Sequence, residues 1–192
     1  MTRRRHPVMI LVAERKLADF IRPPTPHGVL EASGVIAKAA HYYVIFDNVR
    51  RIARIHPSLE PGSKRHLWFG PKRQGDGYED IAFSRYTCRF YLLIEAEKHP
   101  DGTYKALIDE CDESAQYKQR RWVDFAFEKR NTGFEGLTAV RWRGRIICSR
   151  SARGTGAAPA ARDARLVVDA STCFSVRVRS GSLWLVSSCR GG

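Results

Sequence analysis

Apolar and polar residues follow one repeating pattern between about residues 28 and 147. Short apolar runs alternate with Gly, Pro, Asn and Asp turn signals, which is typical of strands in an all-β protein. Each copy opens on a glutamate and places an aliphatic or aromatic residue twelve positions later: Glu31 precedes Tyr43 and Glu79 precedes Tyr91. Glu135 opens a third copy, and the copies are spaced by 48 and then 56 residues.

The pattern predicts four strands in each of the first two copies and the start of a third. The predicted strands cover residues 30–37, 41–46, 50–55 and 66–69, then 78–84, 90–94, 104–111 and 121–127, then 134–142 and 146–148. A further strand over residues 8–12, running into a short helical turn, precedes them. In a propeller such a first strand often completes the final blade.

A strand repeat of roughly 40–50 residues is typical of a β-propeller blade. The sequence therefore predicts an all-β fold, a partial propeller of four-stranded antiparallel blades. Because closed propellers have about 4–8 blades, two and a half blades form an incomplete ring, whose unpaired blade edges favour self-association. The expected division is an N-terminal strand and Pro-rich connector (1–29), the blades (30–148, as 30–70, 78–127 and an incomplete 134–148) and a tail (149–192).

The tail differs from the rest in composition. From residue 143 onward there are nine Arg, no Lys, no Glu and two Asp, so this part carries +7 of the net charge of +13. Two interpretations stay open. Residues 149–165 form a linker before a β-hairpin within 166–188, or the tail is translated out of frame, which translating the other two frames of the gene would test.

The cysteine spacing and the lengths of the apolar runs argue against two classes of protein, cysteine-ligated metal proteins and membrane-spanning proteins. Five cysteines without a CxxC pair give no metal-ligand spacing, and Cys88 and Cys111 fall in or beside predicted strands, which suggests buried free thiols. No stretch approaches the 18 or so apolar residues of a membrane span, so we expect a cytoplasmic protein. We do not expect nucleic acid as a partner, because more than half of the charge excess lies in the last 50 residues.

The repeated acids are the main candidates for chemistry. The innermost strand of each propeller blade lines a central channel, so the glutamates that open the copies would gather around one axis. Hard cations such as Ca²⁺ take six to eight oxygen ligands, which predicts a Ca²⁺ site at the channel mouth. Its candidate ligands are Glu31, Glu79, Asp80 and Glu135. The alternative is structural: such an acid accepts backbone N–H bonds from the next blade and fixes the register between blades.

A second set of polar residues follows the second strand of each copy. Asp47, Asn48 and Glu95 are weak candidates for substrate binding, and the alternative is that they cap turns. No GxSxG, P-loop, GxGxxG or HExxH motif is present.

The Glu-small-Gly opening, the Tyr42-Tyr43-Val44-Ile45-Phe46-Asp47 segment and the blade length resemble the phytase-like and esterase-like β-propellers. These form a loose group with the six-bladed paraoxonase and gluconolactonase type, and the resemblance covers about residues 28–147. It implies a channel-mouth Ca²⁺ site that hydrolyses a phosphate or ester small molecule, with Glu31, Glu79 and Glu135 matching the repeated acid. An incomplete ring implies an inactive site. The alternative is a non-catalytic propeller scaffold that binds a protein or another ligand.

Overall fold

The structure is a computed structural model that describes residues 9–23, 28–130, 133–142, 145–152, 174–179 and 182–188. This part of the chain is all-β, as predicted. It contains one 3-10 turn, η1 (Leu17–Asp19), and no α-helix, and therefore no helix with the length and apolar character needed to cross a bilayer.

Two four-stranded antiparallel sheets account for the first two copies of the repeat. The first is built from β2 (Ala32–Lys38), β3 (His41–Phe46), β4 (Ile52–Ile55) and β5 (Leu67–Phe69). The second is built from β6 (Asp80–Ser84), β7 (Arg89–Lys98), β8 (Tyr104–Cys111) and β9 (Tyr117–Phe127). In both sheets each strand pairs with its neighbour in sequence, which confirms the predicted four-stranded antiparallel units.

Two smaller sheets complete the described structure. β10 (Phe134–Trp142) pairs with β11 (Arg145–Ala152). β1 (Met9–Lys16), β13 (Ser182–Ser188) and β12 (Phe174–Arg179) form a sheet in the order β1-β13-β12, so segments from near the two chain ends share one sheet. The start of the predicted linker (149–165) was wrong, because its first four residues pair with β10 as the end of β11. The rest of it, 153–165, lies outside the described residues, as do residues 24–27 of the Pro-rich connector.

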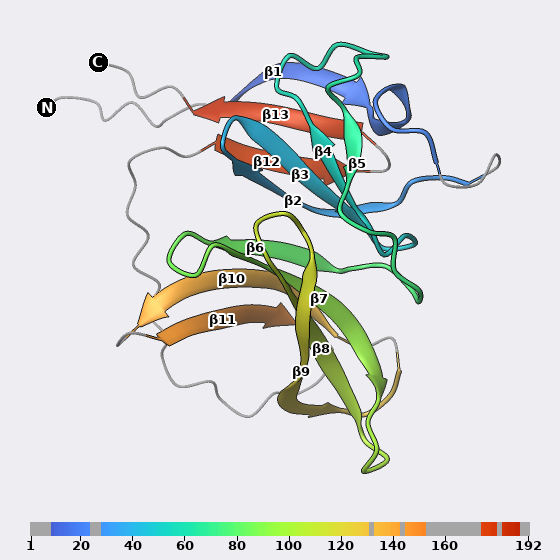
Figure 1. Cartoon of the computed structure of the whole chain (residues 1–192), viewed down its shortest axis with the longest axis vertical. Helices are drawn as coiled ribbons and strands as arrows, with labels where there is room; N and C mark the ends of the chain where they lie inside the picture. Colours follow the sequence, from blue (N-terminus) through green and yellow to red (C-terminus); the bar gives the residue numbers. More distant parts are fainter. Residues whose placement is uncertain are drawn as a thin grey trace, which may run out of the picture.

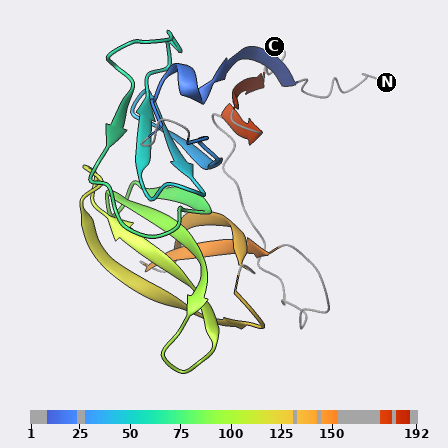
Figure 2. The same ribbon diagram turned by 90° about the vertical axis from the view of Figure 1, so that its right-hand side faces the viewer.

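The first strands of the sheets lie side by side. β2 contacts β6, β6 contacts β10, and β12 contacts the other side of β2. Figure 1 shows these strands following one another along the long axis of the molecule. In Figure 2 the outer strands β5 and β9 lie on the left, away from β10 and β11.

The sheets stack face to face because their second strands are apolar on both faces. Tyr43 and Ile45 of β3 pack with Phe90 and Leu92 of β7 in the core between the first two sheets. The alternate residues of β3 face the opposite way, toward the segment around Leu17. A strand buried on both faces reads as a continuous apolar run, which explains residues 42–46 and 90–94.

A third core lies between the second sheet and β10. Leu93 of β7 and Ala106 of β8 pack there against Phe134 and Leu137. The first and third cores are thus filled from two successive sheets, and the core around Leu17 is filled from the first sheet and the η1 segment. A single sheet of this chain therefore does not bury its apolar faces alone.

The strands predicted from the sequence agree with most of the observed ones, but the prediction for the Cys88 thiol was wrong. β3, β8 and β10 have the predicted bounds. β7 extends the predicted strand by one residue at its start and four at its end, and β9 begins four residues earlier than predicted. Cys111 is buried as expected, but the expectation for Cys88 was wrong: it is exposed, in the turn between β6 and β7, at a φ of 51°. Cys88 lies after β6 ends at Ser84 and before β7 begins at Arg89, so the pairing of these strands does not hold it in the sheet.

The β2–β3 turn stores backbone strain. Its central residues Ala39 and Ala40 both have positive φ, 45° and 55°. Two-residue hairpin turns with positive φ at both positions normally carry Asn-Gly, because a Cβ atom is unfavourable in the left-handed region.

Replacing this pair by Ala39→Asn and Ala40→Gly should therefore raise the free energy of unfolding by about 1–2 kcal/mol. Urea denaturation with an unchanged m-value measures it. The matched reverse change is Gly102→Ala, because Gly102 has a φ of 88° and open space around its Cβ position, so it should lower stability. A double variant less stable than the wild type would contradict the assignment of strain to this turn.

Candidate functional site

Asp80, at the start of β6, joins the first strands of the second and third sheets. Its Oδ2 accepts a hydrogen bond from the backbone N–H of Leu137 in β10 at 2.6 Å, and its Oδ1 accepts one from the N–H of Ile81 at 2.8 Å. One carboxylate thus satisfies a donor on each of two adjacent strands. This is the structural role that the sequence allowed for the repeated acids.

The first sheet approaches Asp80 from the other side. A Cβ atom on Gly34 would lie 2.7 Å from Asp80 Oδ1 and 3.2 Å from Asp80 Cα, so only glycine permits this approach of β2 to β6. The neighbouring Ser33 hydroxyl donates a hydrogen bond to the carbonyl oxygen of Tyr78. Gly34, Asp80 and Leu137 therefore lie at one level across three strands.

Burial raises the pKa of Asp80 above its ordinary value of 3.8, although the N–H groups of Leu137 and Ile81 act in the opposite direction. As the pH falls toward 3.8, the folded protein takes up this proton before the unfolded chain does. Acidification through that range therefore adds stability from this group, the reverse of the usual carboxylate behaviour.

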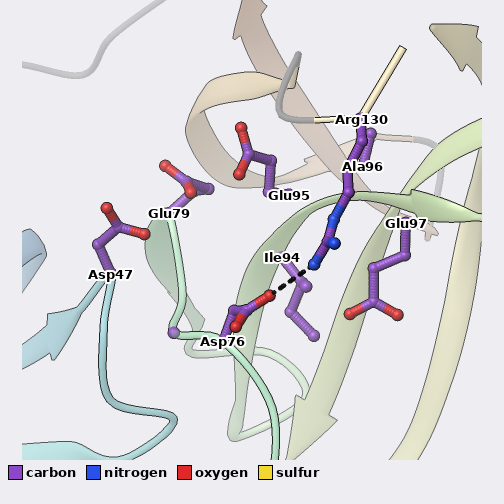
Figure 3. Close-up of a pocket in the computed structure, with 9 residues that line it drawn as sticks. Asp47, Asp76, Glu79, Ile94, Glu95, Ala96, Glu97 and Arg130 are labelled. Atoms are coloured by element: carbon purple, nitrogen blue, oxygen red, sulfur yellow. Dashed lines mark hydrogen bonds and ion pairs between the residues drawn. The ribbon is translucent and has the colours of Figure 1, made fainter.

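An acidic pocket lies at the same end of the first two sheets (Figure 3). It is a small space of about 20 Å³, roughly the size of one water molecule or ion. Its lining consists of five acidic residues, one arginine and three small or apolar residues: Asp47, Asp76, Gly77, Glu79, Ile94, Glu95, Ala96, Glu97 and Arg130. Five carboxylates face one guanidinium in a protein whose net charge is +13.

Three of the acids that the repeat singled out meet here. Asp47 follows β3, Glu79 precedes β6, and Glu95 lies within β7. Figure 3 shows their carboxylates side by side, with Glu97 pointing to the other side of Arg130. Within the part of the chain described, no group of three or more His, Cys, Asp or Glu is already arranged to hold a metal ion.

Local backbone features bring these side chains together. The pairing of β7 with β8 shifts register between Ile94 and Glu97, a bulge that interrupts the strand at the pocket. Gly77 approaches the end of β3 so closely that its N–H donates to the carbonyl of Asp47 at 2.6 Å, leaving no room for a side chain. Bulges often re-aim side chains next to functional sites.

A buried arginine supports the loop that carries Asp76. Arg50 is 4% exposed, and its Nε donates to the carbonyl of Asp76 at 2.6 Å while its Nη2 lies 3.4 Å from Glu97 Oε1. The outer carboxylate of Asp76 pairs with Arg130 at 3.1 Å. Truncating Arg50 would leave Glu97 and the loop carbonyl without this donor.

A second ionic cluster lies deeper. Asp109 of β8 is fully buried and accepts hydrogen bonds from Arg120 at 2.7 and 3.1 Å and from Arg73 at 3.0 Å. Arg73 also stacks over the Tyr117 ring, 3.8 Å from its centroid. Since Arg73 belongs to the connection between the two sheets, Asp109 pins that connection to the second sheet.

Nearby groups are poor nucleophiles. Burial, reinforced by the Asp109 carboxylate, raises the pKa of Cys111 to about 11, so its thiol stays protonated at neutral pH. Burial, again with Asp109, raises the pKa of Tyr78 well above its ordinary value.

The other predicted site residues lie apart from the pocket lining. Glu31 is exposed, and its backbone accepts the N–H of Asp47 through its carbonyl. Asn48 clamps the preceding loop, accepting from the N–H of Glu31 at 3.3 Å and donating to the carbonyl of Val29 at 2.6 Å. The side chain of Glu135 lies outside the described residues.

Sequence reasoning missed Asp76, Glu97 and Arg130. The Gly75-Asp76-Gly77 segment was a usable signal, because an acid between two glycines marks a tight loop next to a strand. The Glu95-Ala96-Glu97 segment breaks the apolar alternation of its strand, which is a weaker signal of a bulge.

Comparison of the chain with protein-family models, with curated proteins and with solved structures found no match.

Replacing Asp80 by alanine should lower the free energy of unfolding by about 1–3 kcal/mol, because the N–H of buried Leu137 loses its acceptor. Asp80→Asn keeps one acceptor oxygen and should lose less stability than Asp80→Ala. Because an amide does not titrate, this variant should also lack the gain in stability that Asp80 gives at acidic pH. Denaturant titrations between pH 4 and 7 measure both. The control is Asp19→Ala, an exposed acid that should stay within about 0.5 kcal/mol of wild type. Equal losses in the two alanine variants would disprove the bridging role.

Proposed function

We propose that the sheets of this chain are successive blades of a β-propeller, and that the acidic pocket between the first two blades binds a divalent cation, Ca²⁺ being the expected ion. The observation that carries the proposal is the convergence of Asp47, Glu79 and Glu95, acids from two copies of the repeat, on one pocket. Carboxylates held close together repel one another, and a cation relieves that repulsion.

The blade arrangement is supported by how the sheets follow one another. The first strand of each sheet contacts the first strand of the preceding sheet: β6 contacts β2, and β10 contacts β6. The pairing of β1 with β13 joins segments from near the two chain ends in one sheet. A propeller uses both features, its first strands facing the central axis and its ends often sharing a blade.

The chemistry of the pocket suits a hard cation. Its space of about 20 Å³ accepts one ion, and carboxylate and carbonyl oxygens are the ligands that Ca²⁺ prefers. Because three ligands are not already in place among the described residues, binding requires the longer side chains of Glu79 and Glu95 to rotate toward Asp47. In an enzyme of the phytase-like or esterase-like kind, the bound ion would polarise a phosphate or ester oxygen for hydrolysis.

A second candidate function is a non-catalytic scaffold or ligand-binding module. The favouring observation is Asp80, a candidate cation ligand whose two oxygens are both engaged by backbone N–H groups. An acid committed to holding strands together is not available to a metal, so some of the repeated acids serve the architecture.

Titration calorimetry of the purified chain with CaCl₂ tests the proposal. We expect saturable binding that Glu79→Gln weakens by at least about tenfold, because it removes one anionic ligand. The matched control is Glu14→Gln, an exposed acid on β1, which should bind as wild type does. No heat at millimolar Ca²⁺, or equal loss in both variants, would contradict the site. Ca²⁺-dependent hydrolysis of a phosphate or carboxylate ester would then separate an enzyme from a scaffold.

A further inference from the structure

A second and larger cavity lies at the opposite end of β2 from the acidic pocket. It is open to solvent on one side, has a volume of about 280 Å³, and is lined by residues 37–42 of the β2–β3 hairpin, by Pro57 and by Arg85, which follows β6. This volume is near the lower limit of pockets that take small organic ligands. The cavity shares no lining residue with the acidic pocket, so it is a separate feature.

The lining combines an apolar wall with positive charge. The methyl groups of Ala37, Ala39 and Ala40, the ring of Pro57 and the half-buried Tyr42 provide apolar surface. Lys38, His41 and Arg85 provide cationic or donor groups, and no acidic residue lines the cavity. A mostly apolar pocket with a few placed polar groups is the usual form of a small-molecule site.

The three basic residues are not equally available. Lys38 Nζ lies 2.7 Å from Glu113 Oε1 and 4.6 Å from the centroid of the Phe83 ring, so its charge is already engaged. His41 Nδ1 lies 2.9 Å from the carbonyl of Ala39, which fixes that nitrogen as the donor. Among the residues the structure describes, the exposed Arg85 guanidinium has no hydrogen-bond or ion-pair partner.

The wall is also the strained segment of the chain. Ala39 and Ala40, both at positive φ, form the turn that closes one side of the cavity. Backbone strain of this kind clusters at ligand sites, where it holds a shape that the sequence does not otherwise favour. Here the strained turn keeps two alanine methyl groups in the wall, where Asn-Gly would leave a polar side chain and a bare backbone.

We propose that this cavity binds a small organic anion. Its carboxylate or phosphonate-type group pairs with Arg85, whose planar guanidinium suits bidentate contact with either group. Its apolar body lies on Tyr42, Pro57 and the alanine wall. A lining with basic residues and no acidic residue favours an anion over a cation here.

Four probes test this with the full chain by calorimetry at neutral pH: phenylphosphonate, benzoate, inorganic phosphate and benzyl alcohol. We expect one organic anion, phenylphosphonate or benzoate, to bind with 1:1 stoichiometry, and the tighter of the two identifies the headgroup. Inorganic phosphate lacks the apolar body and benzyl alcohol lacks the charge, so each should bind at least about tenfold more weakly.

Two variants probe the two halves of the site. Arg85→Gln removes the anchor and Ala37→Leu fills the cavity without changing charge, and each should weaken binding by about tenfold or more. Both positions are exposed, so the wild-type melting temperature should be retained. The matched control is Arg22→Gln, an exposed arginine outside the cavity, which should stay within about twofold.

Three outcomes would overturn the proposal. Equal losses in Arg85→Gln and Arg22→Gln, or phosphate binding as tightly as the organic anions, would show only a general attraction to a basic surface. Benzyl alcohol binding as tightly as the anions would show an apolar cavity without an anion subsite. Lack of saturable binding of either organic anion up to about 10 mM would remove the site altogether.

Discussion

The close approach of the first strands is the constraint on which the rest of the structure depends. Gly34, Asp80 and Leu137 lie at one level of β2, β6 and β10, and the carboxylate of Asp80 occupies the space that a Cβ atom on Gly34 would need. Backbone polar groups this close to a neighbouring sheet must be satisfied, because an unpaired buried N–H costs about as much as a lost hydrogen bond. Asp80 meets that requirement, and the sheets can then stack with their apolar second strands between them.

The stacking of the sheets also creates an acidic pocket at one end of the strands and a basic cavity at the other. At the start of β6, a bulge in β7 and the connection pinned by Arg50 and Asp109 gather the acidic pocket. At the far end of β2, the strained hairpin turn and Arg85 enclose a cavity with basic groups. The two pockets thus differ in charge although neighbouring strands build both. The two proposals therefore assign a cation to one end of this chain and an anion to the other.

Much of the fold followed from the sequence, because strands buried on both faces leave continuous apolar runs between turn signals. This is why residues 41–46 were placed to the residue. Residues 104–111 and 134–142 were also placed to the residue, although they mix apolar and polar positions, because turn signals bound them. The sequence predicted the site less well, because the loops between strands, rather than the spacing of residues along the chain, decide which side chains meet in the pocket. Glu79, Asp47 and Glu95 do meet, whereas Asp80 is used for hydrogen bonding. Asp76 reaches the pocket from a loop, Glu97 from a bulge in β7, and Arg130 from the turn after β9. The exposed Cys88 shows the same limit, because a left-handed turn residue is not visible in an apolar pattern.

Amide hydrogen exchange at Leu137, followed by NMR, tests the central claim most directly. If the Asp80 carboxylate holds this N–H between two sheets, its exchange should be slowed as strongly as that of the ladder amides at the centre of β7, since both open only when the stacked sheets separate. Exchange at the rate of an exposed loop amide would contradict the account, because β6 and β10 would then not be joined through Asp80.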